Sequence, residues 1–133
     1  MHILFFRIAC LLGALAVILG AFGAHGLEGK ISPEQIRSYE TGVRYHFIHT
    51  LALLLTALFY NQLNPRWAGL AGAFFLAGVL LFSASIYLLS TRSLLGIENW
   101  TWLGPITPLG GVAFILGWIF LLVSSVSRPL ADM

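Results

Sequence analysis

Ionisable and aromatic polar side chains gather in one part of the sequence, between residues 25 and 49. His25 ends the first long apolar run, and His49 stands near the start of the second. If both runs cross a membrane, the end of the first and the start of the second lie at the same membrane edge. Ionisable groups are costly in a bilayer and often mark function. The candidate binding cluster consists of His25, Glu40, Arg44, Tyr45 and His49.

Bound metal or haem is one possible chemistry for these residues. His46 and His49 are three residues apart, which places two imidazoles on one helix face, but the spacing supplies no third ligand. We therefore predict no metal site. A haem held between two spans needs a second histidine on a facing helix at matching depth, and His25 alone is available for that role. We predict no cofactor.

Two further interpretations of the cluster remain open. A proton or small-solute pathway would use titratable histidine and Glu40 beside a cavity. In the structural interpretation, which we favour, His25 caps the carboxyl end of the first span. His46 and His49 then bond neighbouring hydroxyl or carbonyl groups.

A second polar cluster, Ser83, Ser85 and Tyr87, lies in the third apolar run. Hydroxyl groups within a span usually bond a backbone carbonyl or a neighbouring helix. Trp118, in the fourth run, needs a partner for its indole N–H, and we expect Ser83 or Ser85 to provide it. Since the sequence offers no nucleophile with a base, no phosphate loop and no carboxylate pair, we predict that the protein is not an enzyme.

The composition indicates that these groups lie in a membrane. Of 133 residues, 59% are hydrophobic and 9% are charged, against roughly 25% charged in soluble domains. Seven basic and five acidic residues cannot cover a small soluble fold, which excludes a water-soluble globular enzyme. The net charge of +2 includes no block of Lys or Arg, so nucleic acid is not an expected partner. The single cysteine, Cys10, excludes an internal disulfide.

Four apolar runs approach the roughly 20 residues that a bilayer core requires. We therefore expect one domain, residues 1–133, folded as an all-α bundle of four antiparallel transmembrane helices. The first run is long for a cleaved signal peptide, and we expect it to be retained. The expected spans cover residues 3–24, 45–62, 68–90 and 108–126.

Residues 33–45 predict an amphipathic lead-in helix before the second span. Ser32, Pro33 and Gln35 have the pattern of an N-cap, a first-turn proline and a capping box. Glu34 precedes Arg37 by three residues, and Glu40 precedes Arg44 by four, which is the spacing of ion pairs within a helix.

Gly42 is the expected bend between this helix and the second span. Such a bend would lay the lead-in helix over His25 and His49 and bring the two imidazoles within reach of each other. We expect a separation below about 10 Å, which one bridging water could span.

Small residues recur at helical spacing in three of the apolar runs. Helices in lipid associate through close packing at such residues. We expect these stripes to face other helices of the same chain rather than a second copy. They are Ala9, Gly13, Ala16, Gly20 and Gly23; Gly69, Ala73 and Ala77; and Gly110, Ala113, Gly117 and Ser124.

Four strings, in this order, resemble the small YgdD-like membrane proteins, domain of unknown function 423. They span residues 20–27, 45–52, 82–87 and 107–111. The resemblance implies four spans in a bacterial inner membrane, but no assigned activity. The residues that match the family pattern are His25, Tyr45, His49, Ser83, Ser85 and Tyr87. His46 and Ala84 depart from it, since Gln and Gly are more usual there.

The expected location is therefore the plasma (inner) membrane, crossed several times. Pairing of Arg37 and Arg44 with acidic residues would leave the freer positive charge on the side of the termini, so we expect both termini in the cytoplasm. We predict a non-enzymatic membrane component that packs with lipid, a partner membrane protein or a second copy of itself. The alternative is a small permeation or proton-handling unit that uses the His/Glu cluster. A continuous polar path past Ser83 would favour this alternative, and a dry core would favour the first function.

Overall fold

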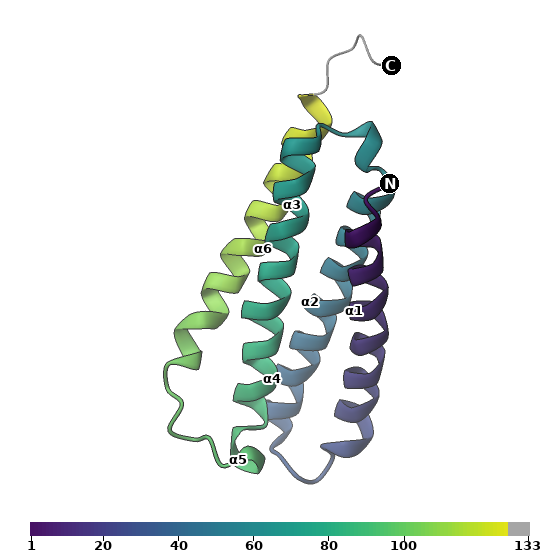
Figure 1. The fold of residues 1–133 in the computed structure, drawn as a ribbon. Helices are drawn as coiled ribbons and strands as arrows, with labels where there is room; N and C mark the ends of the chain where they lie inside the picture. The colour runs from purple at the N-terminus through teal and green to yellow at the C-terminus, as the bar shows by residue number, and fades with distance from the viewer. Residues whose placement is uncertain (128–133) are drawn as a thin grey trace.

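Four long helical segments make up most of the computed structural model, which describes residues 1–127. They run antiparallel, and within these residues the chain forms no strand (Figure 1). Short helices η2 (Tyr60–Gln62) and α5 (Arg92–Leu95) lie in the connections. The long segments are α1 (Ile3–Ala21) with the π-helical turn η1 (Phe22–Gly26); α2 (Pro33–Leu58); α3 (Pro65–Gly78) with π-helical η3 (Val79–Ser83) and α4 (Ala84–Ser90); and α6 (Leu103–Val126).

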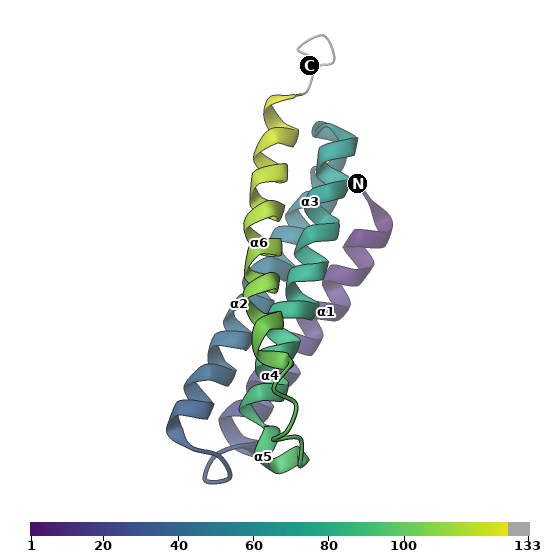
Figure 2. The same cartoon turned by 90° about the vertical axis from the view of Figure 1, so that its left-hand side faces the viewer.

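The two ends of the bundle are joined differently. At the end that holds the N-terminus, the main-chain N–H of His2 donates to the Ala57 carbonyl, and that of Asn64 donates to the Ser124 carbonyl. The opposite end, called the loop end here, holds residues 27–32 and 91–102 (Figure 2). α1 packs on α2, α2 packs on the α3–α4 segment, and α6 packs on that segment too. α1 and α6 are thus the outer helices of the arrangement (Figure 1).

Three of the long segments have the length and apolar composition to cross a membrane. They are Ile3–Gly26, Pro65–Ser90 and Leu103–Val126. Large apolar side chains point outward along them, as Leu11 and Leu122 illustrate with exposed fractions of 72% and 64%. An all-helical membrane protein is therefore confirmed.

The start of α2 confirms the expected capping box. Ser32 Oγ accepts from the Gln35 main-chain N–H at 3.2 Å, and Gln35 Oε1 accepts from the Ser32 N–H at 2.9 Å. The separate lead-in helix and its bend are wrong, because Pro33–Leu58 is one continuous helix. A Cβ on Gly42 would lie 3.0 Å from Ile86 Cγ2. The lack of a side chain at Gly42 therefore lets α2 pack closely on α4, and it does not produce a bend.

The last helix begins earlier than the sequence suggested. α6 starts at Leu103, and Pro108, the expected first residue of the span, lies inside it. Pro105 falls in the first turn, where N–H groups have no partner within a helix. Pro108 deprives the helix of one further hydrogen bond, to the Gly104 carbonyl. This loss close to the helix end does not stop α6 from including residues 103–107.

Two of the three small-residue stripes face neighbouring helices, as expected. In α1, Gly20 lies against Val43 of α2, and Ala9 and Ala16 are buried. In α6, all four stripe residues are buried. The stripe expected in the third span is wrong, because Ala73 is exposed. That segment packs against both α2 and α6, so its buried small residues follow a different face: Ala68, Ala71, Gly72 and Gly78.

A pair of adjacent glycines in α6 tests this packing. A Cβ on Gly110 would lie 2.7 Å from the Leu81 carbonyl carbon and closer still to the Phe82 main-chain nitrogen. Since backbone cannot yield as a side chain can, we expect Gly110→Ala to lower the free energy of unfolding in detergent by about 1–3 kcal/mol. Gly111 is the control, because its Cβ would lie 3.9 Å from the Phe82 ring. Thermal unfolding followed by circular dichroism should show no loss for Gly111→Ala, and equal losses in both variants would contradict the packing.

Candidate functional site

His49 joins α2 to α6 in the middle of the bundle. Its Nδ1 lies 2.7 Å from the Tyr45 carbonyl oxygen, and its Nε2 lies 3.2 Å from Nε1 of Trp118. The ring stacks on Phe114, with centroids 3.5 Å apart. The side chain is buried, with an exposed fraction of 5%.

These two partners fix the protonation of the His49 ring. A carbonyl oxygen can only accept, so Nδ1 carries the proton and donates to Tyr45. An indole N–H can only donate, so Nε2 is unprotonated and accepts from Trp118. Both ring nitrogens are satisfied within the protein, and the imidazole is neutral. The hydrogen bond from Trp118 to His49 thus links α6 to α2, and His49 has no ring nitrogen left for a ligand.

His46 lies one turn before His49 and faces α4. Its Nδ1 is 3.0 Å from the Tyr87 hydroxyl. Nε2 is buried and has no hydrogen-bond partner within residues 1–127. The bonds of His46 and His49 to a hydroxyl and a carbonyl are those that the structural interpretation expects.

Three buried polar atoms in this part of the bundle lack a hydrogen-bond partner among the described residues. They are His46 Nε2, Thr50 Oγ1 and Ser83 Oγ. Gly42 against Ile86, together with Tyr45 against Phe82, sets the register that puts Ser83 level with His46. A polar group that is buried without a partner costs free energy. These atoms form the polar part of the core, and the sequence did not indicate that Thr50 belongs to it.

The hydroxyl cluster of the third segment divides among different partners. Ser85 Oγ donates to the Leu81 carbonyl at 2.6 Å and lies 2.7 Å from Thr107 Oγ1 of α6. Tyr87 pairs with His46 across to α2. The expected bond from Trp118 to Ser83 or Ser85 is wrong, because the indole reaches His49 instead.

The structure does not bring His25 and His49 together. Gly13 lies opposite Thr50, and His25 follows Gly13 by twelve residues, which places it roughly 18 Å further along the bundle. His25 is exposed at the loop end, while His49 is buried. The expected proximity is wrong because α2 runs straight past Gly42. Within residues 1–127, His, Cys, Asp and Glu side chains do not converge in groups of three or more.

The remaining residues of the predicted cluster lie on the outer side of α2. The expected Glu40–Arg44 ion pair is wrong, because both side chains are exposed and neither forms an ion pair within residues 1–127. The expected Glu34–Arg37 pair does form, at 3.0 Å. Glu40 and Arg44 line a pocket of about 210 Å³ against the end of α1, with Gly20 and Gly23 on its other side.

Tyr45 belongs to the aromatic packing between α2 and its neighbours. Its ring lies 4.7 Å from that of Phe82 and 5.7 Å from that of His49, measured between centroids. The role of Tyr39 was missed by sequence reasoning. Its hydroxyl donates to the Leu19 carbonyl at 2.9 Å, and its ring covers Gly23. An aromatic residue opposite a glycine of the α1 stripe was the signal that could have indicated it.

Comparison with known proteins identifies relatives but no activity. The family model for a protein of unknown function (DUF423) matches residues 19–111. The UPF0382 membrane protein YwdK of Bacillus subtilis (strain 168) is 45% identical over 90% of this chain and 97% of its own length. A UPF0382 membrane protein of Staphylococcus aureus (strain bovine RF122 / ET3-1) is 40% identical over 92% of this chain and 94% of its own. No solved structure matches the chain.

Removal of the indole N–H of Trp118 tests the hydrogen bond between Trp118 and His49. Trp118→Phe keeps an aromatic ring but leaves His49 Nε2 buried without a partner, so we expect a loss of about 1–3 kcal/mol in the free energy of unfolding. Trp102→Phe is the control, since Trp102 is exposed, as Trp118 is, but its indole forms no side-chain hydrogen bond within residues 1–127. Nitrogen-15 spectra of labelled histidine should show one neutral ring protonated at Nδ1 in the wild type. Absence of such an Nδ1-protonated neutral ring, or equal stability of both variants, would contradict the bond.

Proposed function

Because this chain belongs to the DUF423 family of proteins of unknown function, we propose that it is a four-span, non-enzymatic component of the plasma (inner) membrane. α2 is the fourth span in this proposal. Both termini lie in the cytoplasm, and the outer surface packs with lipid or with another membrane protein. The names of the relatives describe membrane proteins and nothing more specific.

The observation that carries the proposal is that both ring nitrogens of His49 are occupied by hydrogen bonds within the protein. His49 is the buried member of the predicted cluster; it is held neutral by Trp118 and the Tyr45 carbonyl, and its ring is stacked on Phe114. A general acid, base or metal ligand needs at least one free nitrogen. The histidine therefore supports helix packing rather than turnover.

The outer surface agrees with a packing role. Apolar side chains cover the outer faces of α1 and α6, including Leu11, Val17 and Leu122 with exposed fractions above 60%. Trp100 and Trp102 are exposed at the loop end, where aromatic residues of a membrane interface are expected. Within α2, both ring nitrogens of His49 and Nδ1 of His46 have partners inside the bundle, which reduces the cost of placing these side chains in a bilayer.

Site-directed labelling tests the four-span topology. In a Cys10→Ser background, we introduce Glu28→Cys in the connection before α2 and Asn61→Cys in the connection after it. If α2 crosses the bilayer, a membrane-impermeant maleimide applied to intact cells should label the Glu28→Cys variant, and the Asn61→Cys variant only after permeabilisation. Labelling of both from the same side would contradict the proposal.

A second function, proton or small-solute permeation, is favoured by the unpartnered atoms of the core. His46 Nε2, Thr50 Oγ1 and Ser83 Oγ are buried and lack partners. Ordered water could satisfy them and link them to the Tyr87 hydroxyl. The residues that would serve this function are therefore His46, Thr50 and Ser83, rather than His25, Glu40 and His49.

Flux measurements separate the two functions. In proteoliposomes that contain a pH-sensitive dye, we expect the wild type to dissipate a pH gradient no faster than protein-free liposomes. The permeation function requires a faster decay that His46→Ala abolishes and that His25→Ala leaves unchanged, since His25 is exposed outside the core. That result would replace the proposed function with the second one.

A further inference from the structure

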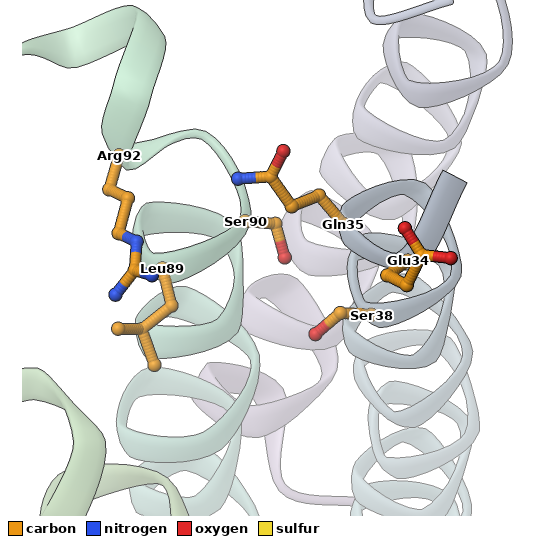
Figure 3. Close-up of a pocket in the computed structure, with 6 residues that line it drawn as sticks. All are labelled: Glu34, Gln35, Ser38, Leu89, Ser90 and Arg92. Atoms are coloured by element: carbon orange, nitrogen blue, oxygen red, sulfur yellow. The ribbon is translucent and has the colours of Figure 1, made fainter. Parts of the chain in front are cut away.

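A pocket of about 260 Å³ lies at the loop end, between the first turns of α2 and the junction of α4 with α5. It is distinct from the histidines of the core and from the pocket beside Glu40. Figure 3 shows its two walls, one from α2 and one from the end of α4 and the first residue of α5. The lining residues are Glu34, Gln35 and Ser38 on one wall, and Leu89, Ser90 and Arg92 on the other.

Ser90 is the residue that points to a ligand. Its side chain is 2% exposed, and its Oγ has no hydrogen-bond partner. The neighbouring Thr91 hydroxyl does bond a carbonyl of its own helix, that of Tyr87, at 2.7 Å. A buried hydroxyl without a partner costs free energy, and a bound acceptor would remove that cost.

The other polar groups of the pocket are also free to donate. Gln35 Oε1 already accepts from the Ser32 N–H, so the amide NH₂ remains, and Figure 3 shows it directed toward the space between α2 and Arg92. The Ser38 hydroxyl points toward the same space (Figure 3). Within residues 1–127, neither Ser38 nor Arg92 forms a side-chain hydrogen bond that would occupy these donors.

One acidic and one basic residue line the pocket, and the basic one is unpaired within residues 1–127. Arg92 forms no ion pair within residues 1–127. The one acidic lining residue, Glu34, is balanced by Arg37 at 3.0 Å, and its carboxylate is turned away from the space between the walls (Figure 3). Its own main-chain N–H and the Arg37 side chain hold the pKa of Glu34 below its usual value, so it stays ionised and paired. The unbalanced group is therefore the Arg92 guanidinium.

We propose that this pocket binds a phosphate group, with Arg92 as the cation and Gln35, Ser38 and Ser90 as neutral donors. The planar guanidinium pairs with two phosphate oxygens at once, and hydroxyl and amide N–H groups satisfy the others. The volume suits a small phosphate ester or a lipid headgroup rather than a larger ligand. The lipid source rests on the proposed function, which places the loop end at the membrane interface; a soluble phosphate ester shares the same chemistry.

Ligand-dependent stabilisation of the delipidated protein in detergent tests the site. The probes are phosphatidylglycerol, diacylglycerol as its phosphate-free counterpart, and glycerol phosphate as the soluble source. A ligand that binds the folded state alone raises the melting temperature. We expect phosphatidylglycerol, but not diacylglycerol, to raise the melting temperature of the wild type, and Arg92→Gln to weaken its apparent affinity at least fivefold. Arg66→Gln, at the opposite end of the bundle, should leave the affinity unchanged.

Ser90→Ala separates ligand binding from folding. Without ligand this variant should be at least as stable as the wild type, because it removes an unpartnered buried hydroxyl. With phosphatidylglycerol it should gain less stability than the wild type does. Equal gains from glycerol phosphate would assign the site to a soluble phosphate ester, and this measurement in detergent stands even if the four-span topology fails. Equal gains in the wild type, Arg92→Gln and Ser90→Ala from both phosphate probes would overturn the proposal.

Discussion

Close approach of helix backbones is the constraint on which this structure depends. Lipid tails are as apolar as leucine side chains, so apolar burial alone does not hold helices together in a bilayer. Contact must come from surfaces that fit closely. At Gly110 the backbone of α6 meets the backbone of residues 81 and 82 directly, and at Gly117 it meets the ring of Phe75. Gly20 of α1 allows a close approach to α2, and Gly42 of α2 allows a close approach to α4. The glycines thus determine how deep in the bundle each polar side chain lies.

That constraint explains where the polar groups meet. Because α2 packs closely on α4 at Gly42, His46 lies within hydrogen-bond distance of Tyr87. One turn further along α2, His49 accepts a hydrogen bond from Trp118 of α6. Each imidazole connects α2 to a different helix, and each bond replaces a contact that water would otherwise provide. The core of this small bundle is therefore specified by directional bonds as well as by close packing.

Features that depend on local sequence could be predicted, and features that depend on long-range packing could not. The capping box at Ser32 and the Glu34–Arg37 pair are confirmed because their partners lie three residues away. The α1 and α6 stripes are confirmed because each outer helix offers its small residues to one neighbouring segment. The third segment lies between two neighbours, so spacing alone did not reveal which face is buried. Gly42 in the sequence suggested a bend in α2, but the helix runs straight. Its straight course separates His25 from His49 and brings His49 to Trp118.

The π-helical segment Val79–Ser83 has a consequence for the geometry of the whole third helix. Its closing bond runs from the Ala84 N–H to the Val79 carbonyl, five residues back instead of four. In effect the segment contains one inserted residue, which rotates everything after it by about 100° relative to an unbroken α-helix. Before the insertion, the helix presents Phe75 and Gly78 to α6; after it, the helix presents Tyr87 to α2. The number of residues in this segment therefore sets the angle, around the helix axis, between the face that packs on α6 and the face that packs on α2. A relative that is one residue shorter here would have to form its histidine contacts from other positions.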